Sequence, residues 1–232
     1  MNPRREKQLT WSPMGIDEKL RALLEIVRKT EALTPRENTR LLGKIDRWIH
    51  GLDSIVTSLS LVQGSLAPRL EGVLGHSMVG NELLSVAMFQ PSTRNLFLEI
   101  ETHYRGTANV SVKPEAFTDL ASLSDMARVL ALVGDAAISM AVLHHLWRPS
   151  LSNAGRLTQR RAELVSNEHL AWLCDQWGLY EHRIHFDPPS STKSEIDHIK
   201  GTLLESLYGI VYVEFGFDEV KRLIHHLETP PV

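Results

Sequence analysis

Two carboxyl side chains that interrupt apolar helical patterns are the first candidates for chemistry. Asp135 is the single acid in the run RVLALVGDAAISMAV at residues 128–142, and Glu205 lies in a second helical pattern at 194–213. Carboxylate oxygens are the ligands that hard cations such as Mg²⁺ prefer in proteins. An isolated acid on a helix is more often structural than catalytic, so the spacing of these residues alone assigns neither acid a role.

The structural alternative is specific for each acid. Asp135 could pair with Arg128, seven residues earlier, or with another helix, and Glu205 could accept a hydrogen bond from Thr202 or a tyrosine. His198 shares a helix face with Thr202 and Glu205, but it lies about 10 Å along the helix from Glu205. His198 is therefore too far along the helix to share one ion with Glu205.

Other patterns in the sequence are weaker signals of chemistry. His182, His185 and Asp187 form a loop-like segment without convergent ligands, which favours a solvated loop over a metal site. Cys174 is the only cysteine, so an internal disulfide and a multi-cysteine zinc site are excluded. The sequence contains no glycine-rich phosphate loop and no nucleophile elbow.

The composition is that of an ordinary globular chain. The 232 residues are 43% hydrophobic and 23% charged, with a formal net charge of −3. This charge argues against a protein that binds nucleic acid through a global basic field, while a local basic patch remains open. We expect no membrane span, and the polar start predicts a loose arm over residues 1–15 and a cytoplasmic location.

The first third of the sequence predicts a helical hairpin over residues 16–75. Thr34–Glu37 has the pattern of a capping box with proline in the first helical turn, so we expect the second helix to begin there. The residues that follow repeat with heptad spacing: Leu41, Ile45, Trp48, Leu52, Ile55 and Leu59. We predict that this heptad seam packs on the preceding helix; the alternative is a docking face for a protein partner or a second copy.

The rest of the sequence predicts a second helical unit. Glycines and a proline between 64 and 80 mark the expected boundary, with the second unit at 80–228. Apolar spacing predicts helices at 121–146 and 194–213, and a further helix that Ser166 caps and that ends at Gly178. The alternating residues 97–114 are compatible with a helix end, a hairpin or an irregular insertion. The predicted fold class is all-α.

Three segments in order resemble the ribonuclease III family. ELLSVAMFQPS at 82–92 resembles that family's opening helix, with Gln90 in place of a histidine. RVLALVGDAAI is similar to the family signature, and the runs at 155–182 and 198–224 are similar to its later helices. The resemblance implies a ribonuclease III-like helical domain, preceded here by the N-terminal hairpin as an extension.

The resemblance also implies a metal site of four acids on two helices, of which this sequence has two. Asp135 and Glu205 are present, but Ala131 and Thr202 stand at the other two positions, and Arg128 replaces a further signature glutamate. Two carboxylates can hold one Mg²⁺ or Mn²⁺ weakly and two ions much less well, because each ion needs anionic ligands. We therefore predict remnant catalytic and metal-binding roles for the two acids.

The function that the resemblance implies is engagement of double-stranded or structured RNA by a homodimer, with weak or absent endonuclease activity. The basic residues that we predict to contact RNA, with ordinary solvated charge as the alternative, are Arg128, Arg160, Arg161 and Lys200. A second hypothesis is a non-catalytic RNA-binding or assembly subunit of a ribonucleoprotein complex, with residues 16–75 as the partner surface. A third is a heterodimer in which another subunit supplies a complete acidic site.

Overall fold

The computed structural model describes residues 11–105, 113–147, 153–187 and 192–228. Within these ranges the chain forms helices and no strand, which confirms the all-α prediction; an isolated β-bridge joins Phe89 and Ile184. The α-helices in chain order are α1 (Ile16–Leu33), α2 (Thr39–Leu61), α3 (Ala67–Leu74), α4 (Glu82–Ala87), α5 (Ser92–Tyr104), α6 (Pro114–Leu146), α7 (Ala154–Leu164), α8 (Asn167–Trp177), α9 (Lys193–Phe215) and α10 (Phe217–Leu223).

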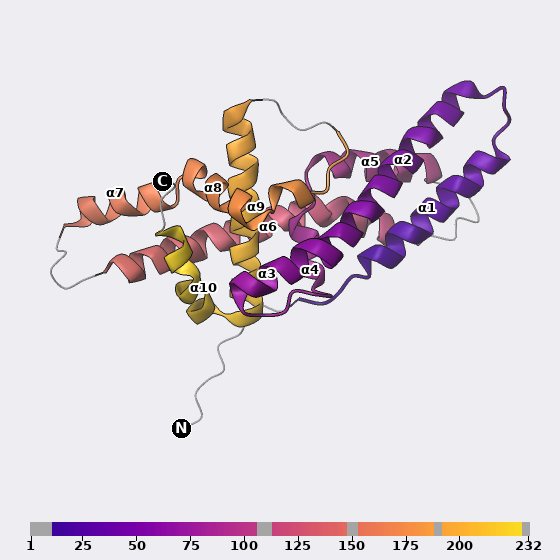
Figure 1. Ribbon diagram of the computed structural model, residues 1–232. Helices are drawn as coiled ribbons and strands as arrows, with labels where there is room; N and C mark the ends of the chain where they lie inside the picture. Colours follow the sequence, from indigo (N-terminus) through magenta and orange to yellow (C-terminus); the bar gives the residue numbers. More distant parts are fainter. Residues whose placement is uncertain (1–10, 106–112, 148–152, 188–191, 229–232) are drawn as a thin grey trace.

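The first two helices, α1 and α2, form the predicted antiparallel hairpin (Figure 1). Ile45, Trp48, Leu52 and Ile55 of the heptad seam are buried, as are the apolar residues of α1. The seam therefore packs within the chain, and the alternative of a docking face on the seam is wrong. A partner protein would have to contact other parts of residues 16–75.

The start of α2 differs from the prediction. Thr34 is not an N-cap; it follows the last residue of α1, and its amide donates to the carbonyl of Glu31. The N-cap of α2 is Asn38, whose side-chain oxygen accepts from the amide of Leu41. Threonine and asparagine both suit an N-cap position. Residues 34–37 form the turn that connects the two helices, so the N-cap falls on Asn38.

The region 64–80, where we expected a boundary between two units, begins as helix rather than as a break in the chain. After α2 the chain continues through a π-helical turn, Val62–Leu66, into α3. Pro68, the second residue of α3, has no amide hydrogen to donate, and the π-helical turn lies directly before this helix. The break comes at Gly75, which ends α3 in the left-handed conformation with φ of +70°. The buried core continues across this connection, and the division into two domains stays a prediction.

Residues 97–105 belong to the end of helix α5. Of the three structures left open for the alternating segment, this part therefore forms a helix end. The alternation of apolar and polar residues there falls within α5, and Phe97, Ile100 and Tyr104 of that helix are buried. A hairpin over 97–105 is thereby excluded. Of the rest of the alternating segment, 106–112 lies outside the described residues, and Lys113 and Pro114 form the start of α6.

The centre of the molecule is the crossing of α6 and α9, with α8 packed against α9 (Figure 1). The predicted bounds of α8 are confirmed: the Ser166 hydroxyl accepts from the amide of His169, and Gly178 ends the helix with φ of +69°. Helix α6 is longer than predicted and begins at Pro114, whose missing amide hydrogen suits the first turn. These helices therefore place the two candidate acids on elements that touch.

Helix α6 is long and apolar enough to cross a membrane by length and composition alone, contrary to our expectation that no segment would be. Its burial supplies another reason for this composition. α4, α5, α9 and α10 all pack on α6, and buried residues such as Leu130, Ile138 and Val142 face them. A core helix surrounded on several sides is apolar for that reason.

Residues 11–15, the described part of the predicted loose arm, are packed on the core rather than loose. Trp11 and Met14 pack partly buried against the core, and the Glu82 carboxylate accepts the amides of Met14 and Ile16. This end of the arm is therefore attached to α4. Residues 1–10 lie outside the described residues.

Candidate functional site

Two glycines set the distance between the helices that carry the candidate acids. A Cβ atom on Gly134 would overlap the carbonyl oxygen of Glu205 and lie 2.7 Å from the amide nitrogen of Gly209. A Cβ atom on Gly209 would overlap the carbonyl oxygen of Leu130. The backbones of α6 and α9 are therefore in direct contact. Because Asp135 follows Gly134, this contact brings the carboxyl groups of Asp135 and Glu205 into one neighbourhood.

The two carboxyl groups lie in different surroundings. Asp135 is exposed, whereas Glu205 is partly buried. Burial, and to a smaller extent the nearby charge of Asp135, together raise the pKa of Glu205 to about 7. Among the described residues neither acid has a hydrogen-bond or salt-bridge partner, so the structural alternatives with Arg128, Thr202 or a tyrosine are wrong.

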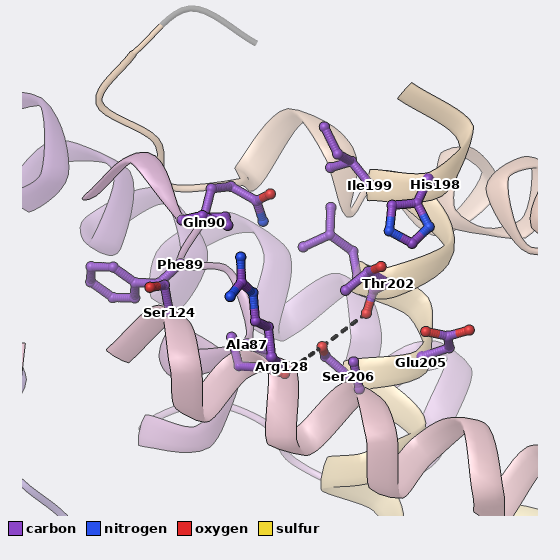
Figure 2. Close-up of a pocket in the computed structure, with 14 residues that line it drawn as sticks. Ala87, Phe89, Gln90, Ser124, Arg128, His198, Ile199, Thr202, Glu205 and Ser206 are labelled. Atoms are coloured by element: carbon purple, nitrogen blue, oxygen red, sulfur yellow. Dashed lines mark hydrogen bonds between the residues drawn. The ribbon is translucent and has the colours of Figure 1, made fainter. Parts of the chain in front are cut away.

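A cavity of about 500 Å³ opens beside the crossing, between the α4–α5 connection, α6 and α9 (Figure 2). The two positions where the sequence lacks the expected acids, Ala131 and Thr202, both line it, and so does Glu205. Asp135 is not among the lining residues. The cavity therefore lies where the missing carboxylates would project, and small or uncharged side chains take their place.

The side chains present do not fit a pair of divalent ions. Ala131 offers no ligand and Thr202 offers an uncharged hydroxyl, which leaves Asp135 and Glu205 as carboxylates. Glu205 must also lose its proton to bind a cation, and its raised pKa opposes this at neutral pH. In the described parts of the chain, no group of three or more histidine, cysteine, aspartate and glutamate side chains could hold a metal ion.

Arg128 lines the cavity, and its side chain extends towards Gln90 in Figure 2. Its nearest carboxylate is that of Asp125, at 3.7 Å, rather than Asp135. Asp125 in turn makes a shorter ion pair of 2.6 Å with Arg94 of α5. The guanidinium of Arg128 therefore places a positive charge at the cavity, where the resemblance implies a glutamate.

The other predicted RNA-contacting residues lie away from this cavity and have local partners. Arg160 of α7 pairs with Glu163 at 2.9 Å, and Arg161 donates to the Ser139 hydroxyl at 3.3 Å. Lys200 of α9 pairs with Asp175 at 2.6 Å. The carboxylates of Glu163 and Asp175 neutralise part of the predicted basic surface, and the roles of these residues in RNA binding stay predictions.

The histidine-containing loop after α8 has no convergent ligands. The His182 ring nitrogen contacts the carbonyl oxygen of Gly178, and that of His185 contacts the carbonyl oxygen of Asp187. Both histidines are half-buried and Ile184 between them is buried, so the loop is less solvated than predicted. Backbone bonds between Ile184 and both Met88 and Gln90 fix this loop against the α4–α5 connection.

The sequence analysis missed an exposed apolar surface on α6. Val129, Leu132 and Met140 are 60%, 70% and 58% exposed, and with Ala136 they share one helix face, which we call the α6 stripe. A second cavity of about 280 Å³, lined almost entirely by apolar groups, lies beside Val129. The signal in the sequence was the apolar character of α6 on all sides.

Comparisons with known proteins agree with the family resemblance. Residues 128–216 match the family described as ribonuclease III domain. The chain is 34% identical to proteins named Ribonuclease 3 from Mus musculus and Homo sapiens over 105 residues, which are 42% of this chain and 7% of those proteins. It is 25% identical to Ribonuclease 3 of Sinorhizobium fredii over 158 residues, 67% of this chain and 55% of that protein. The chain thus spans from less than a tenth to about half the length of these relatives.

Proposed function

Because the chain belongs to the ribonuclease III family through its domain at 128–216, we propose that it engages double-stranded or structured RNA with weak or absent cleavage. The single observation that carries this proposal is the site at the α6–α9 crossing. Asp135 and Glu205 are neighbours there, while Ala131 and Thr202 occupy the cavity where two further acids would be needed. Any Mg²⁺ or Mn²⁺ would depend on the two remaining carboxylates and bind weakly.

The α6 stripe supports a homodimer as part of this proposal. An exposed row of apolar side chains beside an apolar cavity is typical of a protein–protein interface. A two-fold interface uses the same surface on both copies, so one helix can pair with its own copy. The α6 stripe lies on the helix that carries Asp135, so a second copy would place two crossing sites on one dimer.

The second hypothesis, a non-catalytic RNA-binding or assembly subunit, is favoured by the raised pKa of Glu205. A carboxyl group that is about half protonated near neutral pH is a poorer ligand for a cation than an ordinary carboxylate. In this case the protein keeps the helical arrangement as a binding module. Its cytoplasmic location, and a partner on residues 16–75, stay predictions under both hypotheses.

The test is incubation of the protein with duplex RNA, with Mg²⁺, with Mn²⁺ or in EDTA, following both binding and cleavage. Asp135→Asn and Glu205→Gln are the site variants, and Asp17→Asn, an exposed acid on α1, is the matched control. We expect RNA binding by all forms and slow or undetectable cleavage that the two site variants abolish. Absence of binding to duplex RNA contradicts the proposed function, and cleavage that both site variants retain removes these acids from it.

A further inference from the structure

The cavity beside the crossing carries the charge pattern of an anion site. Of the side chains that line it, Arg128 is cationic, His198 offers a ring donor, and Gln90 and Thr202 offer neutral donors. Glu205 is the one carboxylate among the lining residues in the described chain. With one cation and one carboxylate, the lining lacks the excess of negative charge that a site for divalent cations needs.

The positive charge of Arg128 is available to a ligand. Asp125 lies 3.7 Å from the guanidinium, beyond hydrogen-bond distance, and its closer partner at 2.6 Å is Arg94. The Arg128 side chain is 62% exposed, so it can turn towards a ligand with little loss of packing. A planar guanidinium can donate two parallel hydrogen bonds to phosphate oxygens.

The walls of the cavity face one another across a suitable space. Figure 2 shows Arg128 and Gln90 on one side and His198 and Thr202 on α9 across from them. The volume of about 500 Å³ exceeds that of a phosphate group and falls in the range of small-ligand pockets. A phosphate with its attached ribose therefore fits.

We infer that this cavity binds a phosphate group directly, through Arg128 with His198 on the facing wall, and without a bridging metal ion. The phosphate belongs to the RNA backbone or to a free nucleotide, and the first source rests on the proposed function. Arg128 thus provides by direct contact the charge neutralisation that metal ions supply in a four-acid site.

The experiment measures binding of three probes in EDTA: inorganic phosphate, a 5′-mononucleotide and a short RNA duplex. The variants are Arg128→Gln and, as a matched control, Arg21→Gln, an arginine of α1 that is 59% exposed and also paired with an acid on its own helix. We expect Arg128→Gln to weaken phosphate or nucleotide binding at least about tenfold, as for a lost charge-assisted hydrogen bond. The control should bind as wild type, and equal melting temperatures show that all forms are folded.

The outcomes separate this inference from the proposed function. Phosphate and nucleotide binding that Arg128→Gln leaves unchanged, or that appears only with Mg²⁺ or Mn²⁺, overturns the inference while RNA engagement stands. Nucleotide binding that depends on Arg128, without binding of duplex RNA, supports the inference and contradicts the proposed function. Loss of both nucleotide and duplex binding in Arg128→Gln supports both.

Discussion

The contact between α6 and α9 has two parts that differ in what the sequence provides. At the crossing, Gly134 and Gly209 let the two backbones touch. On the side of Ala131 and Thr202 the same helices leave a cavity of about 500 Å³. The crossing specifies the fold, because a side chain at either glycine would separate the helices. The cavity specifies the ligand, because its side chains can change without moving the backbone.

This difference separates fold from function in the molecule. The glycines bring Asp135 and Glu205 together whatever the chemistry beside them, and the lining residues then determine whether the neighbouring space attracts cations or anions. With Ala131, Thr202 and Arg128 at that place, the lining holds one cation and one carboxylate in place of an acidic cluster, and we infer that it binds an anion. The predictions below test the two parts separately.

The largest expected effect follows from adding a methyl group at the crossing, where the two backbones leave no room for it. In Gly134→Ala the Cβ atom would overlap the carbonyl oxygen of Glu205, which is backbone and has no alternative rotamer. We expect a loss of about 3 kcal/mol or more in the free energy of unfolding, because over-packing of this kind shifts two helices. Urea denaturation followed by circular dichroism measures it.

A matched control for this variant is Gly43→Ala in α2, where an added Cβ has no atom within 4 Å. Alanine favours a helix over glycine, so this variant should gain about 0.5–1 kcal/mol. If Gly134→Ala gains stability like Gly43→Ala, the backbones do not touch at the crossing and the first half of the comparison is wrong.

The sequence predicted individual helices better than their contacts. The spacing of apolar residues and the Ser166 and Gly178 caps are local signals, and the structure confirms the helix that they bound. The pairing of Gly134 with Gly209 joins residues far apart in the chain, so no periodicity reveals it. The start of α2 was misplaced although it is local, because Thr34 and Asn38 are both good capping residues and the turn geometry decides between them.

The candidate site was predictable in part for the same reason. The resemblance identified Asp135 and Glu205 with the helices that carry them, and the structure places those helices in contact. The ion pair between Arg94 and Asp125, which leaves Arg128 available, depends on the packing of α5 on α6. The spacing of residues within α6 alone therefore led to a wrong partner for Arg128.

The second prediction concerns the outer face of α6 rather than the face at the crossing. Leu132→Asp places a charge in the α6 stripe at a residue that is 70% exposed, so the fold of one chain should be unaffected. A two-fold interface receives two such charges and loses two leucine contacts, so we expect the dimer to dissociate about a hundredfold more readily. Analytical ultracentrifugation over a range of concentrations measures this change.

The matched control is Leu33→Asp at the end of α1, where the leucine is 77% exposed. It should leave the association state as in wild type. A wild-type chain that sediments as a monomer at every concentration contradicts the homodimer, and equal dissociation of both variants assigns the interface elsewhere.

The third prediction reverses the charge of the cavity. Ala131→Glu combined with Thr202→Asp restores the two carboxylates that the resemblance implies, and the cavity beside both residues has room for them. With Mn²⁺ at ten times its dissociation constant we expect stabilisation of about 1.4 kcal/mol, or roughly 3–6 °C in melting temperature. Wild type should show less. An equal Mn²⁺ shift in wild type would mean that two carboxylates suffice, and the prediction of weak metal binding would be wrong.

The smallest expected effect is the pH dependence of Glu205. Its pKa is raised from 4.5 to about 7 by burial and by Asp135, so the folded chain holds this proton at pH values where the unfolded chain has lost it. The resulting stability is fully present at low pH and is lost as the pH rises through about 7. Partial exposure of the group reduces the effect to on the order of 1 kcal/mol.

Glu205→Gln removes this proton equilibrium, so the variant should gain stability relative to wild type between about pH 5 and 8 in EDTA. Glu168→Gln, at a glutamate that is 85% exposed, should show no such trend. A constant difference between wild type and Glu205→Gln across this range would mean that the carboxyl group titrates normally, and the crossing would then not bury Glu205 beside Asp135 as described.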